Sequence, residues 1–91
     1  MNKILTLCLF PFDDEPLWVI GETEVSSIGT IEENKGDACE GITTVETHPA
    51  NDAAIALSRA RSIARESRLA LYMQTIHADA VSELTLIQRH D

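Results

Sequence analysis

The sequence predicts an α+β domain, in which one helix lies across one face of a mostly antiparallel sheet of four to six strands. Three observations predict this class: one segment with strong helical periodicity, short apolar or β-branched runs on both sides of it, and no linker or repeat. The expected order of elements is β-β-β-α-β-β. With 91 residues, the chain is expected to form one domain, 1–91, with a single modest core.

Two strands are predicted near the N-terminus. Residues 3–10, KILTLCLF, are almost continuously apolar, which is typical of a strand that is covered on both sides or central in a small sheet. Pro11 and Pro16 interrupt this pattern, because proline cannot donate a ladder hydrogen bond. Residues 17–24, LWVIGETE, form the next strand, and Gly21 indicates a bulge or a bend within it.

A third strand is predicted before the helix. Residues 25–33 continue the second strand or form another, and residues 34–37, NKGD, are the clearest hairpin turn in the sequence. Residues 38–46, ACEGITTVE, follow this turn and are rich in β-branched side chains, so they are predicted to form a strand.

Residues 49–67 are the predicted helix. Pro49 suits its first turn, where the missing N–H breaks no hydrogen bond. The apolar stripe is mostly alanine, so Leu57 and Ile63 are expected to supply most of its bulk, while Ile55 falls on the outer face. The stripe comprises Ala53, Ala56, Leu57, Ala60, Ile63 and Ala64.

Two further strands are predicted after the helix, LALYMQTI (69–76) and VSELTLIQ (81–88), with a turn at 77–80 between them. One helix covers only one face of such a sheet. The other face, or a strand edge, is therefore expected to be left to water or to a partner.

Charge is distributed unevenly along the chain, which has a formal net charge of −8. Residues 1–52 hold eleven acids against two lysines, a balance of −9, whereas residues 53–91 hold four acids against five arginines, a balance of +1. An acidic body argues against direct nucleic-acid binding and fits a basic protein partner, although net charge also serves solubility.

The two cysteines, Cys8 and Cys39, are interpreted as free thiols. The apolar N-terminal run ends at Pro11, lacks a small-residue cleavage site, and is too short to span a bilayer. We therefore expect a cytoplasmic protein without a membrane segment.

Catalytic and metal sites are not expected. The three histidines and two cysteines lack the short paired spacing of zinc ligands, so no metal and no cofactor is predicted. Adjacent carboxylates such as Glu32 and Glu33 are interpreted as solvated charges, and no serine lies in a nucleophile-elbow motif. An enzyme is therefore not predicted.

Two groups of residues are candidates for partner binding. Arg61, Arg65 and Arg68 occupy about one sector of the helix and could bind phosphate or an acidic partner, or else pair with acids of the sheet. The first candidates are acids of the N-terminal half and one tryptophan: Asp13, Asp14, Glu15, Trp18, Glu22, Glu24, Glu32 and Glu33.

Trp18 allows two interpretations. It shares a strand face with Ile20, Glu22 and Glu24. If that face points away from the helix, Trp18 is an exposed contact residue ringed by carboxylates. If that face lies under the helix, Trp18 belongs to the core, and this second interpretation is favoured.

The run from Thr47 through Ala53-Ala54-Ile55 to Ala64, followed by LALYMQTI and a turn, resembles an uncharacterised family of small bacterial α+β proteins. The resemblance covers residues 47–88, and the glycine typical of the family's last turn is replaced by Ala78-Asp79-Ala80. In size, acidity and element order the chain also resembles phage-encoded anti-defence inhibitors, including anti-CRISPR proteins. That resemblance implies masking of a host complex and transfers no site residue.

The expected function is accordingly that of a non-enzymatic acidic module, an inhibitor that masks a basic, nucleic-acid-binding site on a larger protein. The alternative is a structural or homo-oligomeric module, for instance a homodimer, that pairs through an exposed strand edge or sheet face.

Overall fold

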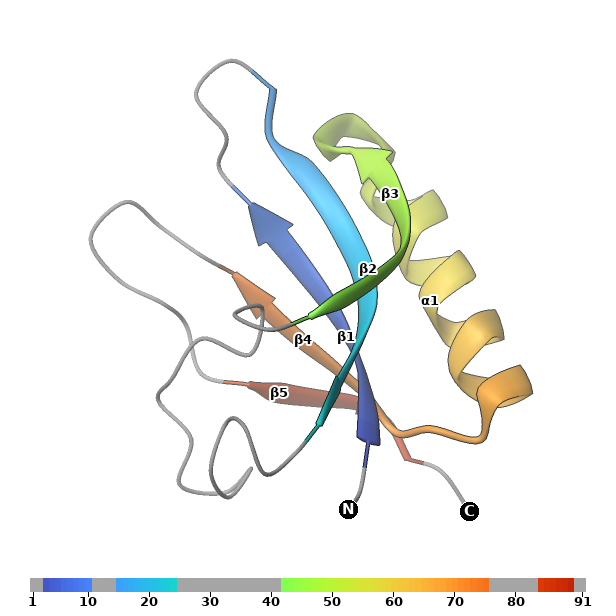
Figure 1. Ribbon diagram of the computed structural model, residues 1–91. Helices are drawn as coiled ribbons and strands as arrows, with labels where there is room; N and C mark the ends of the chain where they lie inside the picture. The colour runs from blue at the N-terminus through green and yellow to red at the C-terminus, as the bar shows by residue number, and fades with distance from the viewer. Residues whose placement is uncertain (1–2, 11–14, 25–41, 76–83, 90–91) are drawn as a thin grey trace.

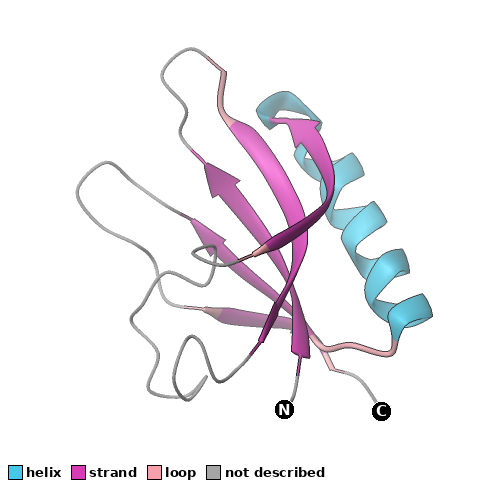
Figure 2. Ribbon diagram, viewed as in Figure 1, coloured by secondary structure: helices cyan, strands magenta, loops and turns pink. Residues whose placement is uncertain are grey.

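A computed structural model describes residues 3–10, 15–24, 42–75 and 84–89. Its strands are β1 (Lys3–Phe10), β2 (Leu17–Glu24), β3 (Thr43–Pro49), β4 (Leu71–Thr75) and β5 (Thr85–Gln88). A short 3-10 helix (Ala50–Asp52) leads into the α-helix α1 (Ala53–Ser67). Figures 1 and 2 show α1 lying along one face of the sheet.

The five strands form one mixed sheet in the order β3-β2-β1-β4-β5. β1 pairs antiparallel with β2 and parallel with β4, while the β2–β3 and β4–β5 pairs are antiparallel. The predicted α+β class and element order are confirmed. The β1–β4 pair is parallel because α1 connects β3 to β4 as a crossover. The helix returns the chain to the end of the sheet at which β1 begins, whereas a hairpin turn would have made the next strand antiparallel.

The first two strands match the predicted ranges, and the later ones are displaced. β3 extends to Pro49, which was predicted to begin the helix. β4 begins at Leu71 and β5 at Thr85, so residues 69, 70 and 84 lie outside the strands that were predicted to include them. The predicted strand at 25–33 and the turns at 34–37 and 77–80 lie outside the described residues. Within the described part of the chain, no helix is long and apolar enough to cross a membrane.

The helix packs on the sheet through a row of alanines. Ala56, Ala60 and Ala64 are fully buried at intervals of four residues, and Leu57 and Ile63 pack beside them, partly buried. Ile55 is 52% exposed, so its predicted outward position is confirmed, whereas Ala53 is exposed although it was placed on the stripe.

A left-handed residue ends the helix. Arg68 has φ 58°, and its N–H donates to the carbonyls of Ala64 and Arg65, while the N–H of Leu69 donates to Ala64 at 2.9 Å. This arrangement satisfies carbonyls that the last turn would leave without a partner.

The core lies between α1 and the sheet. Leu5 and Leu7 of β1, Ile20 of β2 and Leu71 of β4 are buried against the alanine row. Trp18 is partly buried against the same cluster, so the strand face that it shares with Ile20 lies under the helix. The interpretation of Trp18 as a core residue is therefore confirmed.

The opposite face of the sheet is also buried along β1 and β2. Ile4, Thr6 and Cys8 alternate with the helix-facing leucines, and each is at most 3% exposed; their neighbours Val19 and Thr23 are 6% and 2% exposed. The expectation that this face is left to water or a partner is therefore wrong for these residues. The apolar run of residues 3–10 had indicated a strand covered on both sides, and the buried hydroxyls there have partners: Thr6 Oγ1 donates to the carbonyl of Gly21 at 3.2 Å and lies 3.4 Å from Thr23 Oγ1.

Gly21 marks an irregularity in the sheet, as predicted. The β2–β3 register shifts there, since Ile20 pairs with Glu46 but Gly21 pairs with Thr44, so Val45 is the extra residue. A Cβ atom on Gly21 would lie 2.5 Å from Cγ1 of Ile42, so only glycine leaves room for Ile42 at this position.

Cys8 is disulfide-bonded, so the prediction of two free thiols is wrong. Cys39 lies outside the described residues, but it is the only other cysteine of the chain and hence the only one that can pair with Cys8 within it. Sequence reasoning missed the bond because Cys8 occupies an apolar strand, where a buried thiol is equally at home.

Candidate functional site

A cluster of three polar side chains joins the edge strand β3 to α1. Glu46 and His48 are two residues apart on β3 and therefore share the face that looks towards the helix. Arg59 reaches them from α1: its Nε and Nη2 each donate to a carboxylate oxygen of Glu46 at 3.0 Å. His48 Nε2 lies 2.5 Å from the same carboxylate.

These contacts set the ionisation of Glu46. The hydrogen bonds from Arg59 and then from His48 lower the pKa of the Glu46 carboxyl from 4.5 to about 2, against a smaller opposing effect of burial. The same carboxylate raises the pKa of Arg59. Both groups are therefore charged at neutral pH, and the carboxylate is a poor proton acceptor.

The hydrogen bonds of this cluster link α1 to β3. Both oxygens of Glu46 are engaged, so the carboxylate is not free to bind a ligand or to act as a general base near pH 7. Among the described residues, no group of three or more His, Cys, Asp or Glu side chains could hold a metal ion.

Sequence reasoning did not select Glu46, His48 or Arg59. The alternative of pairing with acids of the sheet was stated for Arg61, Arg65 and Arg68, whereas the helix arginine that pairs with Glu46 is Arg59. The spacing of Glu46 and His48 on one strand was visible in the sequence. Their contact with Arg59 also needs α1 to pack back against β3, which strand or helix periodicity does not predict.

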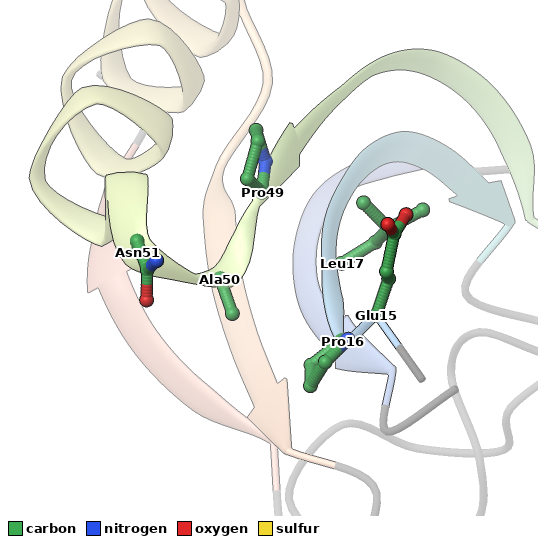
Figure 3. Close-up of a pocket in the computed structure, with 6 residues that line it drawn as sticks. All are labelled: Glu15, Pro16, Leu17, Pro49, Ala50 and Asn51. Atoms are coloured by element: carbon green, nitrogen blue, oxygen red, sulfur yellow. The ribbon is translucent and has the colours of Figure 1, made fainter. Parts of the chain in front are cut away.

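A pocket of about 340 Å³ lies where the start of β2 meets the junction between β3 and α1. Figure 3 shows its lining: Glu15, Pro16 and Leu17 from one segment, and Pro49, Ala50 and Asn51 from the other. Backbone and side-chain bonds hold these walls, because Ala50 N–H donates to the carbonyl of Pro16 at 3.1 Å and Trp18 Nε1 donates to the carbonyl of Ala50 at 3.3 Å.

The predicted acidic residues are not gathered into one patch within the described parts of the chain. Glu15 is exposed at the pocket, before β2 begins, and Glu24 is exposed at the other end of β2, nine residues further along the chain or roughly 30 Å for an extended chain. Glu22 lies between them and is 3.8 Å from Lys3 Nζ. The remaining acidic candidates, Asp13, Asp14, Glu32 and Glu33, lie outside the described residues.

The secondary candidates lie on the surface of the second half of α1 and at its C-cap. Arg61, Arg65 and Arg68 are exposed. The backbone carbonyl of Arg61 accepts a hydrogen bond from Gln88 of β5, which ties the middle of α1 to that edge strand. Their side chains are accessible to an anionic partner.

No family model, curated protein or solved structure matches the chain.

Proposed function

We propose that the protein is a non-enzymatic binding module whose acidic N-terminal half docks on a basic site of a larger protein, a site that otherwise holds nucleic acid. One observation carries the proposal: the balance of −9 over residues 1–52, against +1 over the rest. Such a charge gradient attracts a cationic surface over long range and orients the approach.

The geometry of the polar groups supports a binding role over catalysis. Among the described residues, Glu46 has a clearly lowered pKa, and its carboxylate is held ionised and occupied by Arg59 and His48. A general acid or base at neutral pH needs the opposite environment, one that moves the pKa towards 7.

The narrower proposals follow from the resemblance to anti-CRISPR proteins: an anti-defence inhibitor of phage origin, which masks its target. A cytoplasmic location belongs with them as a prediction. The disulfide at Cys8 weighs against that location, because thiols of cytosolic proteins are usually kept reduced.

Charge reversal tests the main proposal. We expect a captured partner to associate with the wild-type chain at a rate that falls steeply as salt rises, and a duplex DNA fragment to compete for the same site. Reversing Asp13, Asp14 and Glu15 to lysine should slow association and leave the melting temperature nearly unchanged.

Glu66→Lys is the matched control, since Glu66 is an exposed acid in the other half of the chain. Its partner for comparison is the single variant Glu15→Lys, which changes the net charge by the same amount. Glu66→Lys should slow association less than Glu15→Lys does. A partner whose association ignores salt, DNA and the acidic residues would contradict the proposal.

A second candidate function is a homodimer formed through β3. This strand lies at one edge of the sheet, and Val45 on it is 49% exposed beside exposed threonines at 43, 44 and 47. An edge of β-branched residues suits strand addition. Sedimentation would detect a dimer that Val45→Lys dissociates; a monomer at all concentrations would exclude it.

A further inference from the structure

The pocket at the start of β2 combines apolar walls with a polar rim. Pro16, Leu17, Pro49 and Ala50 supply apolar surface, and Glu15 and Asn51 supply a carboxylate and an amide (Figure 3). None of the six described residues that line it is a lysine or arginine, and Glu15 belongs to the acidic half of the chain. The lining is therefore complementary to an occupant with an apolar stem and a cationic end.

The walls are set before any ligand arrives. The hydrogen bond from Ala50 N–H to Pro16 joins the two segments, and the Trp18 indole holds the Ala50 carbonyl from the core side. Pro16 and Pro49 have restricted backbones, so little conformational freedom remains to be lost when the pocket is filled. Such preformed pockets are where interface side chains contribute most to affinity.

We propose that this pocket receives an arginine side chain of the protein partner. The methylene stem lies against the prolines and Leu17, and the guanidinium pairs with the Glu15 carboxylate. Arginine fits better than lysine because its planar fork can donate two parallel hydrogen bonds to one carboxylate. This inference rests on the proposed function, since it names the group of the basic partner that the acidic half recognises.

The direct test is an NMR titration with N-acetyl-arginine methylamide, compared with the lysine analogue. We expect shift changes at the amides of Leu17, Ala50 and Asn51, and at least tenfold weaker binding in Glu15→Gln. Glu66→Gln, which removes the same charge from an exposed acid of α1, should bind like the wild type. Shift changes spread over the acidic residues generally, or equal binding of the lysine analogue, would overturn the arginine pocket.

A pocket-filling variant separates shape from charge. Ala50→Leu fills the space without changing the charge and keeps the backbone bond to Pro16, so it should abolish arginine binding. Asn51→Leu, at an exposed position, obstructs the pocket in the same way and serves if Ala50→Leu lowers the melting temperature.

The two proposals fail differently. If both pocket-filling variants bind the captured partner as the wild type does, while reversal of Asp13–Glu15 slows binding, the pocket proposal is wrong and the charge proposal stands. If partner binding ignores salt and charge reversal, the proposed function is wrong whatever the pocket binds.

Discussion

Arg59 of α1 donates two parallel hydrogen bonds, each 3.0 Å long, to the carboxylate of Glu46 on the edge strand β3. The bidentate geometry fixes the relative position of helix and strand as well as their charges. Because Glu46 also contacts His48, the edge of the sheet is attached to the helix through one carboxylate.

This carboxylate should make stability depend on acid pH. Its pKa is about 2 in the folded chain against 4.5 for an ordinary glutamate, so its contribution is fully present above about pH 4.5 and is lost as the pH falls towards 2. We expect Glu46→Gln to lower the free energy of unfolding by no more than about 1 kcal/mol at pH 7, because the pair is partly solvated.

Urea unfolding at a series of pH values, followed by the fluorescence of Trp18, the only tryptophan, measures this effect. The difference between wild type and Glu46→Gln should shrink to nothing by about pH 2. Glu66→Gln removes a comparable charge from an exposed position and is the control. A difference that is constant between pH 5 and pH 2 would contradict the assignment.

The alanine row predicts which helix positions tolerate bulk. Ala60 is fully buried against the sheet, so Ala60→Leu should destabilise the fold by about 1–3 kcal/mol through overpacking. Ala54→Leu makes the same change at an exposed position and should alter the unfolding midpoint little. Equal midpoints for the two variants would show that the helix does not pack through this row.

Gly21 gives a prediction that depends on space alone. In Gly21→Ala, the new Cβ would meet Cγ1 of Ile42 at 2.5 Å and the carbonyl oxygen of Thr43 at 2.7 Å, so we expect a loss of about 1–3 kcal/mol. Adding Ile42→Ala should restore only part of the loss, since the carbonyl remains. A double-mutant cycle by urea unfolding measures the coupling, and a coupling of zero would refute the contact.

The disulfide at Cys8 is tested by mass and by stability. The chain isolated under alkylating, non-reducing conditions should show no modifiable thiol after unfolding and should weigh two hydrogen atoms less than the reduced form. Reduction should lower the free energy of unfolding by roughly 2–4 kcal/mol, the typical contribution of a disulfide bond. Two alkylated cysteines in the freshly isolated chain would show that the thiols are free.

The sequence pattern correctly predicted those strands and helix faces that are determined by residues close together in the chain. The ranges of β1 and β2 follow from the apolar run between Lys3 and Phe10 and from Pro16 before Leu17. Helical periodicity correctly placed Ile55 outward and three of the four stripe alanines inward, and strand alternation placed Trp18 and Ile20 on one face.

What the pattern missed depends on contacts between distant residues. Thr6 and Thr23 look like solvent-facing residues in a strand, but their hydroxyls approach each other across β1 and β2 in a buried layer. The Glu46–Arg59 pair needs α1 to fold back against β3, so that two side chains 13 residues apart in the chain meet. Such pairings arise from tertiary structure, which a period of two or 3.6 residues does not encode.

The place of β1 in the sheet has a consequence for biosynthesis. Among the described strands β1 is translated before the others, and β2 can pair with it soon afterwards. Its other neighbour, β4, begins only at Leu71, which pairs with Leu5. The most buried strand of the molecule must therefore wait with one edge open until the helix and β4 have been translated. Domains with such long-range pairing fold slowly and are exposed to aggregation in the interval, so a nascent chain of this protein should depend on chaperones or on rapid elongation more than a hairpin-built sheet of the same size.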